Sequence, residues 1–482
     1  MLKRTILSAA ILASISGTAF AAPAYIVTTD ADSGGGSLRE ALGSGASVIT
    51  IAGGVGDIVI NDTLEYDSEN PLKIIGSGQT IIGGDFTLFA ATEGADLEII
   101  NLSFEGPGIY DENDNPTGYD LDNQGGGNAI LVDVPLDREG VVQLRLANVG
   151  VSGVGDHGIL MSDCDELDCG AGQTGTGDGS DASIHAVFSD VTVIDSGWGK
   201  PDGDGVRLNE RDLGGIIFEA THSSFNNNGA DGIELDEADE GDVMIAVRNV
   251  ELDRNGAFCR PLPDDESDAE EPYEERCYDD GEIDLDDAFD IDEDGDGSIL
   301  GWIAHVWATG NLDEGIDFDE AGPGGFDLAL SHIEGWNNGD EAIKTSEEGD
   351  GDLVLTLSSV TAGENGNDGM QLEEDDDGNV HVVIQSTDVM MSEGDGIKVE
   401  EDDDGDLNLA IRGVNSTENE DAGILAAEDN DGDFTMTVNG TVTAGNGDVG
   451  IDAEQDDAGE GTLRVRGSNI SDGIATTGVD EI

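Results

Sequence analysis

The sequence is poor in basic residues. Of its 482 residues, 108 are Asp or Glu and only 18 are Lys or Arg, so the formal net charge is −90. Nucleic acids and anionic membrane surfaces attract proteins through clustered positive charge, which this chain does not have. The composition therefore excludes ordinary electrostatic binding to either partner. It favours surroundings in which salt or divalent cations screen the negative charge.

Aromatic residues are also scarce, at 5% of the chain. Few aromatics and a high net charge are typical of disordered proteins, which cannot bury enough apolar surface to fold. Here, however, apolar residues recur at a constant spacing over much of the sequence. That periodicity indicates a folded chain.

Long apolar stretches are absent after the first 21 residues. Residues 1–21, MLKRTILSAAILASISGTAFA, have a basic start, a short apolar stretch interrupted by Ser and Gly, and a small-residue end at Ala19 and Ala21. This pattern predicts a secretory signal peptide rather than a membrane anchor. We therefore expect an exported protein in the periplasm, at the cell surface or outside the cell. No transmembrane segment should remain after cleavage, and residues 22–482 should form a single domain.

Cysteine is rare as well, and the four cysteines fall into two local pairs. Cys164 lies close to Cys169, and Cys259 lies close to Cys277. In an oxidising compartment each pair predicts a disulfide within its own loop. A metal site is less favoured, because no histidine stands beside these cysteines at ligand spacing. The disulfides would staple two loop insertions, residues 160–185 and 256–300.

What the sequence does have is an internal repeat of 27 residues. Apolar anchor residues follow Asp-Gly-like pairs at this spacing: Ile316, Ile343, Met370, Ile397, Ile424 and Ile451. After each anchor, apolar and polar residues alternate with a period of two, which predicts strands. Further upstream we place anchors at Val206, Ile233 and Ile283, with longer spacings caused by the insertions. Residues 301–482 are expected to be the regular part of the array.

Two residue types mark the turns of the repeat. A glycine recurs eight residues after most anchors, where we expect a turn with positive φ: Gly214, Gly241, Gly324, Gly351, Gly378, Gly405, Gly432 and Gly459. An asparagine recurs before the following anchor, with Ser392 as the exception: Asn228, Asn311, Asn338, Asn365, Asn419, Asn446 and Asn469. Stacked Asn side chains can hydrogen-bond from one coil to the next. Asp204, Asp231 and Asp395 are predicted to form turns rather than to bind ligands.

Strands joined by Gly and Asn turns, repeated in register, predict an all-β chain that forms a right-handed parallel β-helix of the pectate-lyase-like type. We expect about 14 coils. A leucine-rich repeat has an overlapping period, but it would need a Leu-x-x-Leu-x-Leu run that leads into the Asn. In this sequence the Asn is flanked by Gly and polar residues, which favours the β-helix.

The segment VTTDADSGGGSLREAL, Val27 to Leu42, resembles the start of the CSLREA-type, polymorphic-outer-membrane-protein-like β-helix proteins. In these proteins a Ser-Leu-Arg-Glu-Ala helix follows a Gly-rich turn and caps the first coil. The usual leading cysteine is Gly36 in this chain. The resemblance implies an exported or surface β-helix with an N-terminal cap over residues 22–60, and it implies no particular activity. Ser37 is a suitable N-cap for the short helix.

Acidic residues recur in register in the regular coils. Glu373, Asp375 and Asp377 of one coil should lie beside Glu400, Asp402 and Asp404 of the next, followed by Asp429 and Asp431. Neighbouring unit charges at strand spacing repel by about 1 kcal/mol at the dielectric constant of water and by about 3–4 kcal/mol near a protein surface. Ca²⁺ ions between coils would relieve this repulsion, since Ca²⁺ takes six to eight oxygen ligands. The alternative is a solvated acidic face.

A second candidate calcium site is the stretch DIDEDGDGS, Asp290 to Ser298. Asp290, Asp292, Asp294, Gly295 and Asp296 match the first half of an EF-hand-type loop. The twelfth position is Gly301, so the bidentate Glu of an EF-hand is missing. The stretch predicts a calcium loop without EF-hand identity.

The sequence alone favours a non-catalytic function. We expect a Ca²⁺-binding surface, adhesion or matrix module, whose partners are polysaccharides or other cell-surface components held through Ca²⁺. The alternative is a carbohydrate-active enzyme, a polysaccharide lyase or a glycoside hydrolase. In that case Lys344, Asp317 and Asp319 are the catalytic candidates. Their simpler interpretation is electrostatic, with Lys344 and Lys398 relieving repulsion among neighbouring carboxylates, and an acidic face would also repel uronate substrates.

Overall fold

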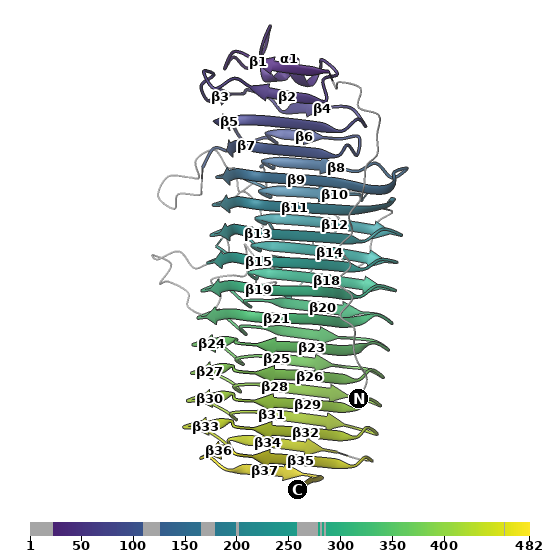
Figure 1. The fold of residues 1–482 in the computed structure, drawn as a ribbon, viewed down its shortest axis with the longest axis vertical. Coiled ribbons are helices and arrows are strands. Elements are labelled where there is room, and N and C mark those ends of the chain that lie inside the picture. Colours follow the sequence, from purple (N-terminus) through teal and green to yellow (C-terminus); the bar gives the residue numbers. More distant parts are fainter. Residues whose placement is uncertain are drawn as a thin grey trace.

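The protein is an elongated stack of parallel strands (Figure 1). The computed structural model describes residues 23–108, 126–164, 179–198, 202–257, 286–456 and 458–482, together with the backbone of residues 278–279 and 282–283. Strand pairing within the two large sheets is parallel, which requires a crossover between successive strands of one sheet. Such crossovers are almost always right-handed, and the chain forms the predicted right-handed parallel β-helix.

Sheet B has 14 strands, which follow one another along the stack. They are β4 (Leu64–Tyr66), β6 (Phe89–Ala91), β8 (Ile130–Asp133), β10 (Ile159–Ser162), β12 (Val206–Asp212), β14 (Ile233–Asp239), β18 (Phe289–Gly295), β20 (Asp317–Ala321), β22 (Lys344–Glu347), β25 (Gln371–Glu374), β28 (Lys398–Asp402), β31 (Leu425–Asp429), β34 (Ile451–Gln455) and β37 (Ile474–Thr477).

Sheet A has 22 strands and forms the remaining walls of the solenoid. They are β1 (Ala24–Val27), β2 (Val48–Ile51), β3 (Ile58–Val59), β5 (Leu72–Ile82), β7 (Leu97–Glu105), β9 (Glu139–Ser152), β11 (Asp181–Ile194), β13 (Ile216–Asn226), β15 (Val243–Asp253), β19 (Ile299–Thr309), β21 (Gly325–Trp336), β23 (Asp352–Ser358), β24 (Thr361–Gly363), β26 (Val380–Gln385), β27 (Asp388–Met390), β29 (Leu407–Arg412), β30 (Asn415–Thr417), β32 (Phe434–Asn439), β33 (Val442–Ala444), β35 (Gly461–Arg466), β36 (Asn469–Ile470) and β38 (Val479–Glu481).

The predicted anchors stack inside the solenoid. Ile316, Ile343, Met370, Ile397, Ile424 and Ile451 are all fully buried. Backbone hydrogen bonds join each of these residues to the residue that follows the next anchor, as in Lys398 N to Met370 O at 2.8 Å. One predicted anchor is wrong. Phe289, and not Ile283, lies opposite Ile233, because Ile283 belongs to the short antiparallel pair β16 (Tyr278–Asp279) and β17 (Glu282–Ile283).

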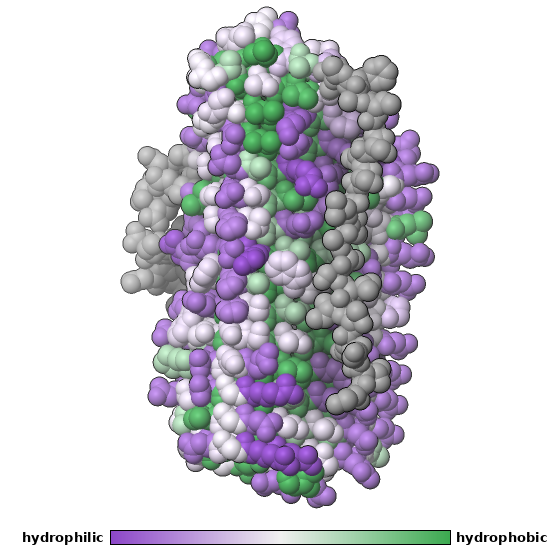
Figure 2. All heavy atoms as spheres, viewed as in Figure 1, coloured by the Kyte–Doolittle hydropathy of each residue, from purple (hydrophilic) through white to green (hydrophobic). Residues whose placement is uncertain are grey.

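This correction extends the regular array toward the N-terminus. Phe289 precedes Ile316 by one repeat, so strands β18 and β19 continue the 27-residue register inside the range 256–300 that was predicted as an insertion. The longer spacing between the anchors Ile233 and Phe289 comes from the residues between β15 and β18. Lengthwise columns of hydrophilic residues on the surface, visible in Figure 2, follow from the same repetition.

The asparagine column is confirmed over most of its length. Side-chain amides donate to the next coil from Asn311 to Asn338 at 2.9 Å and from Asn419 to Asn446 at 3.0 Å. The irregular coil contributes Asn255, which the sequence spacing missed, between Asn228 and Asn311. At the C-terminal end Asp472, and not Asn469, accepts the bond from Asn446. The column joins successive turns within the buried interior.

The recurring glycines are required for a different reason from the one predicted. None of these eight glycines has a positive φ. Instead, a Cβ at Gly378 would stand 1.7 Å from the carbonyl oxygen of Gly351 and 2.5 Å from Oε1 of Glu374. The turns of successive coils touch backbone to backbone, so no side chain fits between them.

A short helix covers one end of the solenoid, as the resemblance implied. Helix α1 (Leu38–Leu42) begins after Ser37, whose Oγ accepts a hydrogen bond from Glu40 N at 3.2 Å. The helix buries Leu38, Ala41 and Leu42 at the end of the stack (Figure 1). The relation to CSLREA-type proteins itself stays a prediction. Within the described residues, none of the helices has the length and hydropathy needed to cross a bilayer.

Two predictions lie outside the described residues. The predicted signal peptide occupies residues 1–21, which the structure does not describe. Of the four cysteines only Cys164 is described, and it is buried. The pairings Cys164–Cys169 and Cys259–Cys277 therefore stay predictions.

Candidate functional site

The candidate site is the outward face of five neighbouring strands of sheet B. In a strand, residues two apart point to the same side. The two outward positions of each strand therefore form two rows, which we call the central polar face: Arg207 and Asn209 on β12, Glu234 and Asp236 on β14, Asp290 and Asp292 on β18, Asp317 and Asp319 on β20, and Lys344 and Ser346 on β22. Four adjacent carboxylates occupy its centre, with Arg207 and Arg211 toward one end and Lys344 toward the other.

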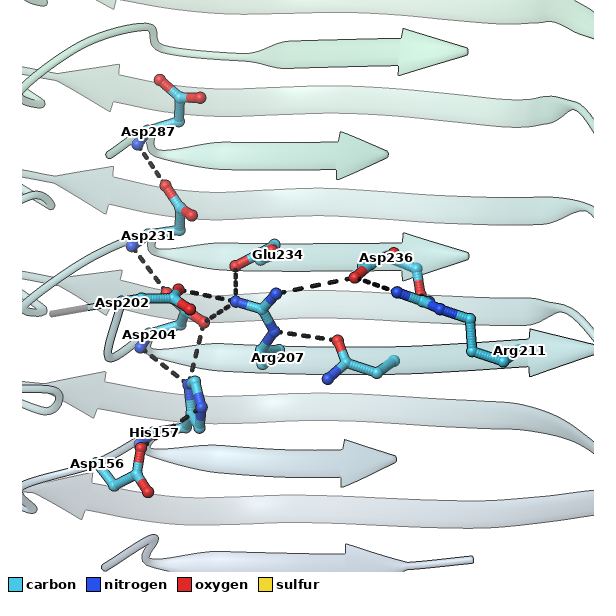
Figure 3. A network of polar contacts seen from close by, with 11 residues as sticks. Asp156, His157, Asp202, Asp204, Arg207, Arg211, Asp231, Glu234, Asp236 and Asp287 are labelled. Carbon is cyan, nitrogen blue, oxygen red and sulfur yellow. Dashed lines mark hydrogen bonds and ion pairs between the residues drawn. The ribbon is translucent and has the colours of Figure 1, made fainter. Parts of the chain in front are cut away.

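Arg207 neutralises the carboxylates at the β12 end (Figure 3). Its Nη1 lies 2.8 Å from Asp202 Oδ1 and 2.5 Å from Glu234 Oε2. Its Nε donates to Asn209 Oδ1 at 3.0 Å, and the residue is 1% exposed. A buried guanidinium with several donors holds these acceptors in fixed positions.

Arg211 plays the same part for the next carboxylate. Its Nη2 donates to Asp236 Oδ2 at 2.7 Å, and its side chain is fully buried. The two arginines thus hold the carboxylates at one end of the central polar face in fixed positions and compensate part of their charge.

A column of acidic turn residues borders the face. Asp204 Oδ1 accepts from Asp231 N at 3.1 Å, Asp231 accepts from Asp287 N, and Asp287 accepts from Glu314 N at 2.7 Å (Figure 3 shows the first two contacts). Asp395 likewise accepts from Ala422 N at 2.7 Å. Asp204, Asp231 and Asp395 lie in turns, as predicted, but these bonds join one coil to the next, and Asp204 and Asp231 also belong to groups of three carboxylates that could hold a metal ion. His157 closes this column at the other side, since its Nδ1 accepts from Asp204 N at 3.1 Å.

The centre of the face is a two-by-two array of carboxylates. Asp290 lies opposite Asp317, and Asp292 lies opposite Asp319, on the adjacent strands β18 and β20. Opposite residues are about 4.8 Å apart at the backbone, and residues two apart along a strand are separated by about 6.6–6.8 Å. The array therefore offers carboxyl pairs at two different separations.

The surroundings change the pKa of Asp290, Asp317 and Asp319 to different extents. Burial, together with the neighbouring charge of Asp317, raises the pKa of Asp319 well above its usual value. Burial and the surrounding carboxylates do the same for the pKa of Asp290. Burial also raises the pKa of Asp317, but Lys344 opposes the rise through an ion pair of 2.6 Å. Asp319 and Asp290 retain a proton to higher pH than carboxyl groups in water.

Lys344 is the counter-cation of the array. Besides Asp317 it contacts Glu314 Oε1 at 3.5 Å. Burial lowers the pKa of Lys344, but Asp317, Asp319 and Glu314 raise it above its usual value. The amine therefore stays charged and is unsuited to act as a base. This confirms that Lys344 relieves repulsion, and Lys398 does the same by bridging Glu373 and Glu400 at 2.8 and 2.7 Å.

Carboxylate triads surround the face. Four groups of three carboxylates in the described residues bring one oxygen each within 4.8 Å of one another. They are Asp202–Asp204–Glu234, Asp231–Glu234–Asp290, Asp287–Glu314–Asp317 and Asp313–Glu314–Asp340. Arg207 already lies in the first triad and Lys344 in the third. The donor set is hard oxygen throughout, which suits Ca²⁺ or Mg²⁺ rather than softer metals.

The predicted calcium loop has a different geometry from the one expected. Residues Asp290 to Gly295 belong to strand β18 and do not curl around a common centre. Asp290 joins Asp231 and Glu234 in a triad. Among the described residues, Asp292, Asp294 and Asp296 take part in none of these triads. An extended strand separates alternate carboxylates too widely for one ion to bind all of them.

The predicted acidic ladder is in register but contains none of the described triads. Glu373 lies opposite Glu400, and Asp402 lies opposite Asp429, as expected. Lys398 supplies the positive charge between the first pair. Asp375, Asp377, Asp404 and Asp431, like these four, are in none of the triads found in the described part of the chain.

Sequence reasoning missed part of the site. Asp290 and Asp292 were interpreted as a loop because the anchor was placed at Ile283. Counting 27 residues back from Ile316 gives Phe289, and this spacing alone would have aligned Asp290 and Asp292 with Asp317 and Asp319. Asp313, Glu314 and Asp340 lie in turns, where no alternation pattern indicates which way a side chain points.

Comparison with known proteins adds no identification. No family model matches the chain, and no curated protein matches it. Solved structures that resemble it include the A-module of the Azotobacter vinelandii mannuronan C-5 epimerase AlgE4, with 10% identity and a TM-score of 0.33, over 84% of this chain and 88% of that one. The periplasmic alginate epimerase AlgG matches at 10% identity and a TM-score of 0.36, over 89% and 84%.

The catalytic domain of a GH87 α-1,3-glucanase variant in complex with tetrasaccharides matches at 10% identity and a TM-score of 0.37, over 95% of this chain and 69% of that one. These TM-scores are all below 0.5. We therefore base neither the fold nor the function of this chain on them.

Proposed function

We propose that the protein is a carbohydrate-active enzyme, a glycoside hydrolase that holds a neutral polysaccharide along the central polar face. The observation that supports this is the array of Asp290, Asp292, Asp317 and Asp319 with Lys344 against one member. Glycoside hydrolysis needs two carboxyl groups, one protonated and one ionised, on either side of the scissile bond. The array supplies both protonation states.

Asp319 is the proposed general acid. Its pKa is raised well above the usual value by burial and by Asp317, so its carboxyl group keeps a proton to higher pH than a carboxyl group in water. Its Oδ1 is buried and has no hydrogen-bond partner. A protonated carboxyl group with a free oxygen can donate to the glycosidic oxygen as the bond breaks.

Asp317 is the proposed general base. It is 7% exposed, and Lys344 holds its Oδ2 at 2.6 Å and favours the ionised form. Its Oδ1 is buried and has no hydrogen-bond partner. In this proposal a water molecule admitted with the substrate gives its proton to that oxygen. Asp317 and Asp319 are two residues apart on one strand, a backbone separation of about 6.6–6.8 Å. In inverting hydrolases the two carboxyl groups are about 6.5–9.5 Å apart, which leaves room for a water molecule. We propose that the carboxyl groups of Asp317 and Asp319 keep a separation in this range, and we therefore expect inversion at the anomeric carbon.

The substrate should be uncharged. The central polar face and its bordering turns carry many more carboxylates than cations, and an acidic polysaccharide would be repelled. Lyase chemistry on a uronate also needs a base near pH 7 and a cation to neutralise the substrate carboxylate. Lys344 remains protonated because the carboxylates around it raise its pKa, so it does not provide that base. The proposed location is extracellular or periplasmic, in keeping with the predicted signal peptide.

This proposal reverses the preference drawn from the sequence. Sequence alone could not show that Asp319 is partly buried or that Lys344 pairs with Asp317 rather than with solvent. These two facts separate the protonation states of neighbouring carboxyl groups, which is a common property of acid–base catalysts.

A second candidate function is binding of a divalent cation, as expected of a Ca²⁺-dependent surface or matrix module that contacts polysaccharides. The observation that favours it is the triad Asp313–Glu314–Asp340. Burial and adjacent carboxylates raise the pKa of Asp313 to about 8 and that of Glu314 to about 7. Lys344 contacts Glu314 at 3.5 Å, and a Ca²⁺ ion at this position would compensate the remaining negative charge of the triad.

The test is a survey of neutral polysaccharides, including α- and β-glucans, mannans, galactans and xylans, for release of reducing ends. Asp317→Asn and Asp319→Asn should abolish release. Because Asp317→Asn also weakens the ion pair with Lys344, the circular dichroism of both variants must show that they are folded. The exposed Asp376→Asn serves as the matched control. Nuclear magnetic resonance of the first product should show inverted configuration. Hydrolysis that survives Asp319→Asn would contradict the proposal.

A further inference from the structure

The most unusual feature outside the proposed active site is a column of glutamates inside the solenoid. Eight glutamates and one glutamine occupy the fifth position of successive coils, counting the anchor as the first: Glu210, Glu237, Glu293, Glu320, Glu347, Glu374, Glu401, Glu428 and Gln455. The glutamates are at most 1% exposed and Gln455 is 5% exposed. We call this set the inner column.

Each glutamate of the regular coils uses one oxygen in the same way. Oε1 accepts a hydrogen bond from the glycine N–H four residues later, for instance at 2.9 Å from Gly378 to Glu374 and at 2.7 Å from Gly405 to Glu401. This hydrogen bond to the turn holds the carboxyl group at an equivalent position in each of these coils. The second oxygen, Oε2, then points along the column.

These second oxygens face one another without a donor between them. Oε2 of Glu320, Glu347, Glu374 and Glu401 is buried and has no hydrogen-bond donor. Yet neighbouring carboxyl groups of the column lie within hydrogen-bond reach, as with Glu293 and Glu320, or Glu374 and Glu401. None of the ion pairs in the described part of the chain involves a column glutamate. Two ionised carboxylates at this distance in the interior would be strongly unfavourable.

The last member of the inner column, on β34, shows what the column needs. Gln455 takes the place of a glutamate, and its Nε2 donates to Oε2 of Glu428. Its Oε1 accepts from Phe434 N at 3.1 Å. The amide has the shape of a carboxyl group and supplies a donor without titrating. A glutamate can play this role for its neighbour only when it carries a proton.

We propose that the inner column is a hydrogen-bonded file of protonated glutamates, and that loss of these protons in alkali destabilises the solenoid. Each protonated carboxyl group donates to the next along the axis, and Gln455 supplies the final donor. The fold is then held by protons that the medium can remove, which makes its stability a function of pH. This inference does not depend on the proposed enzymatic activity.

The electrostatic surroundings agree with this arrangement. Burial raises the pKa of Glu210, Glu237 and Glu374 to about 9 and that of Glu320 to about 10. Burial raises the pKa of Glu293 and Glu401 to about 8 and that of Glu428 to about 7. Other charges act mainly at the two ends of the column. At one end, Asp163 and Arg211 affect the pKa of Glu210, and Arg211 affects that of Glu237. At the other end, Asp402 affects the pKa of Glu401, and that of Glu428 is affected by Asp406, Asp429 and Asp433.

The direction of the pH effect follows from these shifts. A glutamate in the unfolded chain loses its proton near pH 4.3. Between that pH and the raised pKa of the folded state, the native protein binds more protons than the unfolded chain. Stability supplied by the column is therefore complete below about pH 4 and declines as the pH rises through 7–10.

The first experiment measures melting temperature from pH 5 to pH 10 at constant ionic strength. The wild type should lose on the order of 5 °C or more between pH 6 and pH 9.5. The paired variant Glu374→Gln with Glu401→Gln should lose less, because two protons no longer dissociate. The control pair Glu348→Gln with Glu393→Gln, on the exposed surface, should follow the wild type. A wild-type melting temperature that is constant over this range would overturn the proposal.

The second experiment detects the protons directly, and its deciding observation is made on the wild type. The infrared spectrum of the wild type at pH 7 should contain the C=O stretching band of protonated carboxyl groups, and the Gln pair should reduce this band. Absence of the band would show that the column is ionised and would overturn the proposal. Elemental analysis tests the alternative that bound metal cations, and not protons, compensate the inner column. Metal that co-purifies with the wild type in stoichiometric amount, and is lost in the Gln pair, would assign the column to cations instead of protons.

Discussion

Sheet B carries carboxyl groups on both of its faces, and the negative charge of these groups is compensated differently on the two faces. On β20, Asp319 and Glu320 are neighbours in sequence but point to opposite sides. Asp319 meets Asp317, Lys344 and Asp292 on the central polar face, whereas Glu320 meets Glu293 and Glu347 in the inner column. Outside, lysine and arginine compensate the charge. Inside, we propose that protons do so, because no cationic side chain is paired with the column in the described residues.

The comparison shows that an acidic composition does not determine what the acids do. The same residue type stabilises turns as Asp204 and Asp395, forms the proposed catalytic pair as Asp317 and Asp319, and fills the interior as the inner column. The surroundings of each carboxyl group decide its charge, and the charge decides its role. The following changes test this difference between inside and outside.

The largest effect is expected from a carboxyl group placed inside but away from the inner column. Ile397 is fully buried and lies four residues before Glu401 on the same inward-facing side of its coil. Ile397→Asp would bury a carboxyl group without the glycine N–H that Glu401 uses, so we expect a loss of about 4–5 kcal/mol in the free energy of unfolding. Urea denaturation measures it. A loss as small as that of a surface substitution would show that the interior tolerates acids at any position.

The second prediction separates the two faces of one strand. Asp319→Asn should lower kcat by about 10²–10⁴-fold, since it removes the proposed general acid. Glu320→Gln, one residue away on the inner face, should leave kcat within a factor of about three. In the wild type, activity should fall as the pH rises through the raised pKa of Asp319, because the acid must be protonated. Equal losses in both variants would mean that the effect is structural.

The third prediction concerns cations on the outer face. Ca²⁺ should raise the melting temperature beyond an NaCl buffer of equal ionic strength, because a ligand of the native state stabilises by about 2.7 kcal/mol at a hundredfold excess over its Kd. Asp340→Asn should remove most of this increment, whereas Asp376→Asn should not. If both salts act equally, the outer carboxylates are only screened.

The smallest effect is expected where the counter-cation is partly exposed. Lys398 bridges Glu373 and Glu400 at the surface of the regular coils, with its side chain 22% exposed. Lys398→Gln should lower the free energy of unfolding by about 1 kcal/mol at low salt and by less in high salt. Urea denaturation at two salt concentrations measures both values. A loss that is independent of salt would indicate lost packing rather than lost charge.

The sequence by itself determined the architecture, because the β-helix repeats one local pattern. The 27-residue spacing, the period-two alternation and the stacked Asn positions each restrict the chain in the same way, so the register from Ile316 to Ile451 could be read directly. The position of Asp204, Asp231 and Asp395 in turns followed from local chemistry, whereas their hydrogen bonds to the next coil did not. Where the spacing was interrupted, before Phe289, the prediction placed the anchor wrongly and mistook a strand for a calcium loop.

Only the tertiary structure decided which carboxyl groups are paired, buried or protonated. The alternation already implied that Glu401, four residues after Ile397, faces inward with Val399. Because Glu401 belongs to a run of five acidic residues, Glu400 to Asp404, the sequence suggested that all five lie on one surface. Whether an acidic side chain is ionised depends on its distance from Lys344, Arg207 or another acidic side chain, and these partners often lie on the neighbouring coil, 27 residues away in sequence. Such distances arise from the stacking of coils, and no local pattern encodes them. The fold was therefore predictable from repetition, whereas the candidate site required the charges to be placed in space.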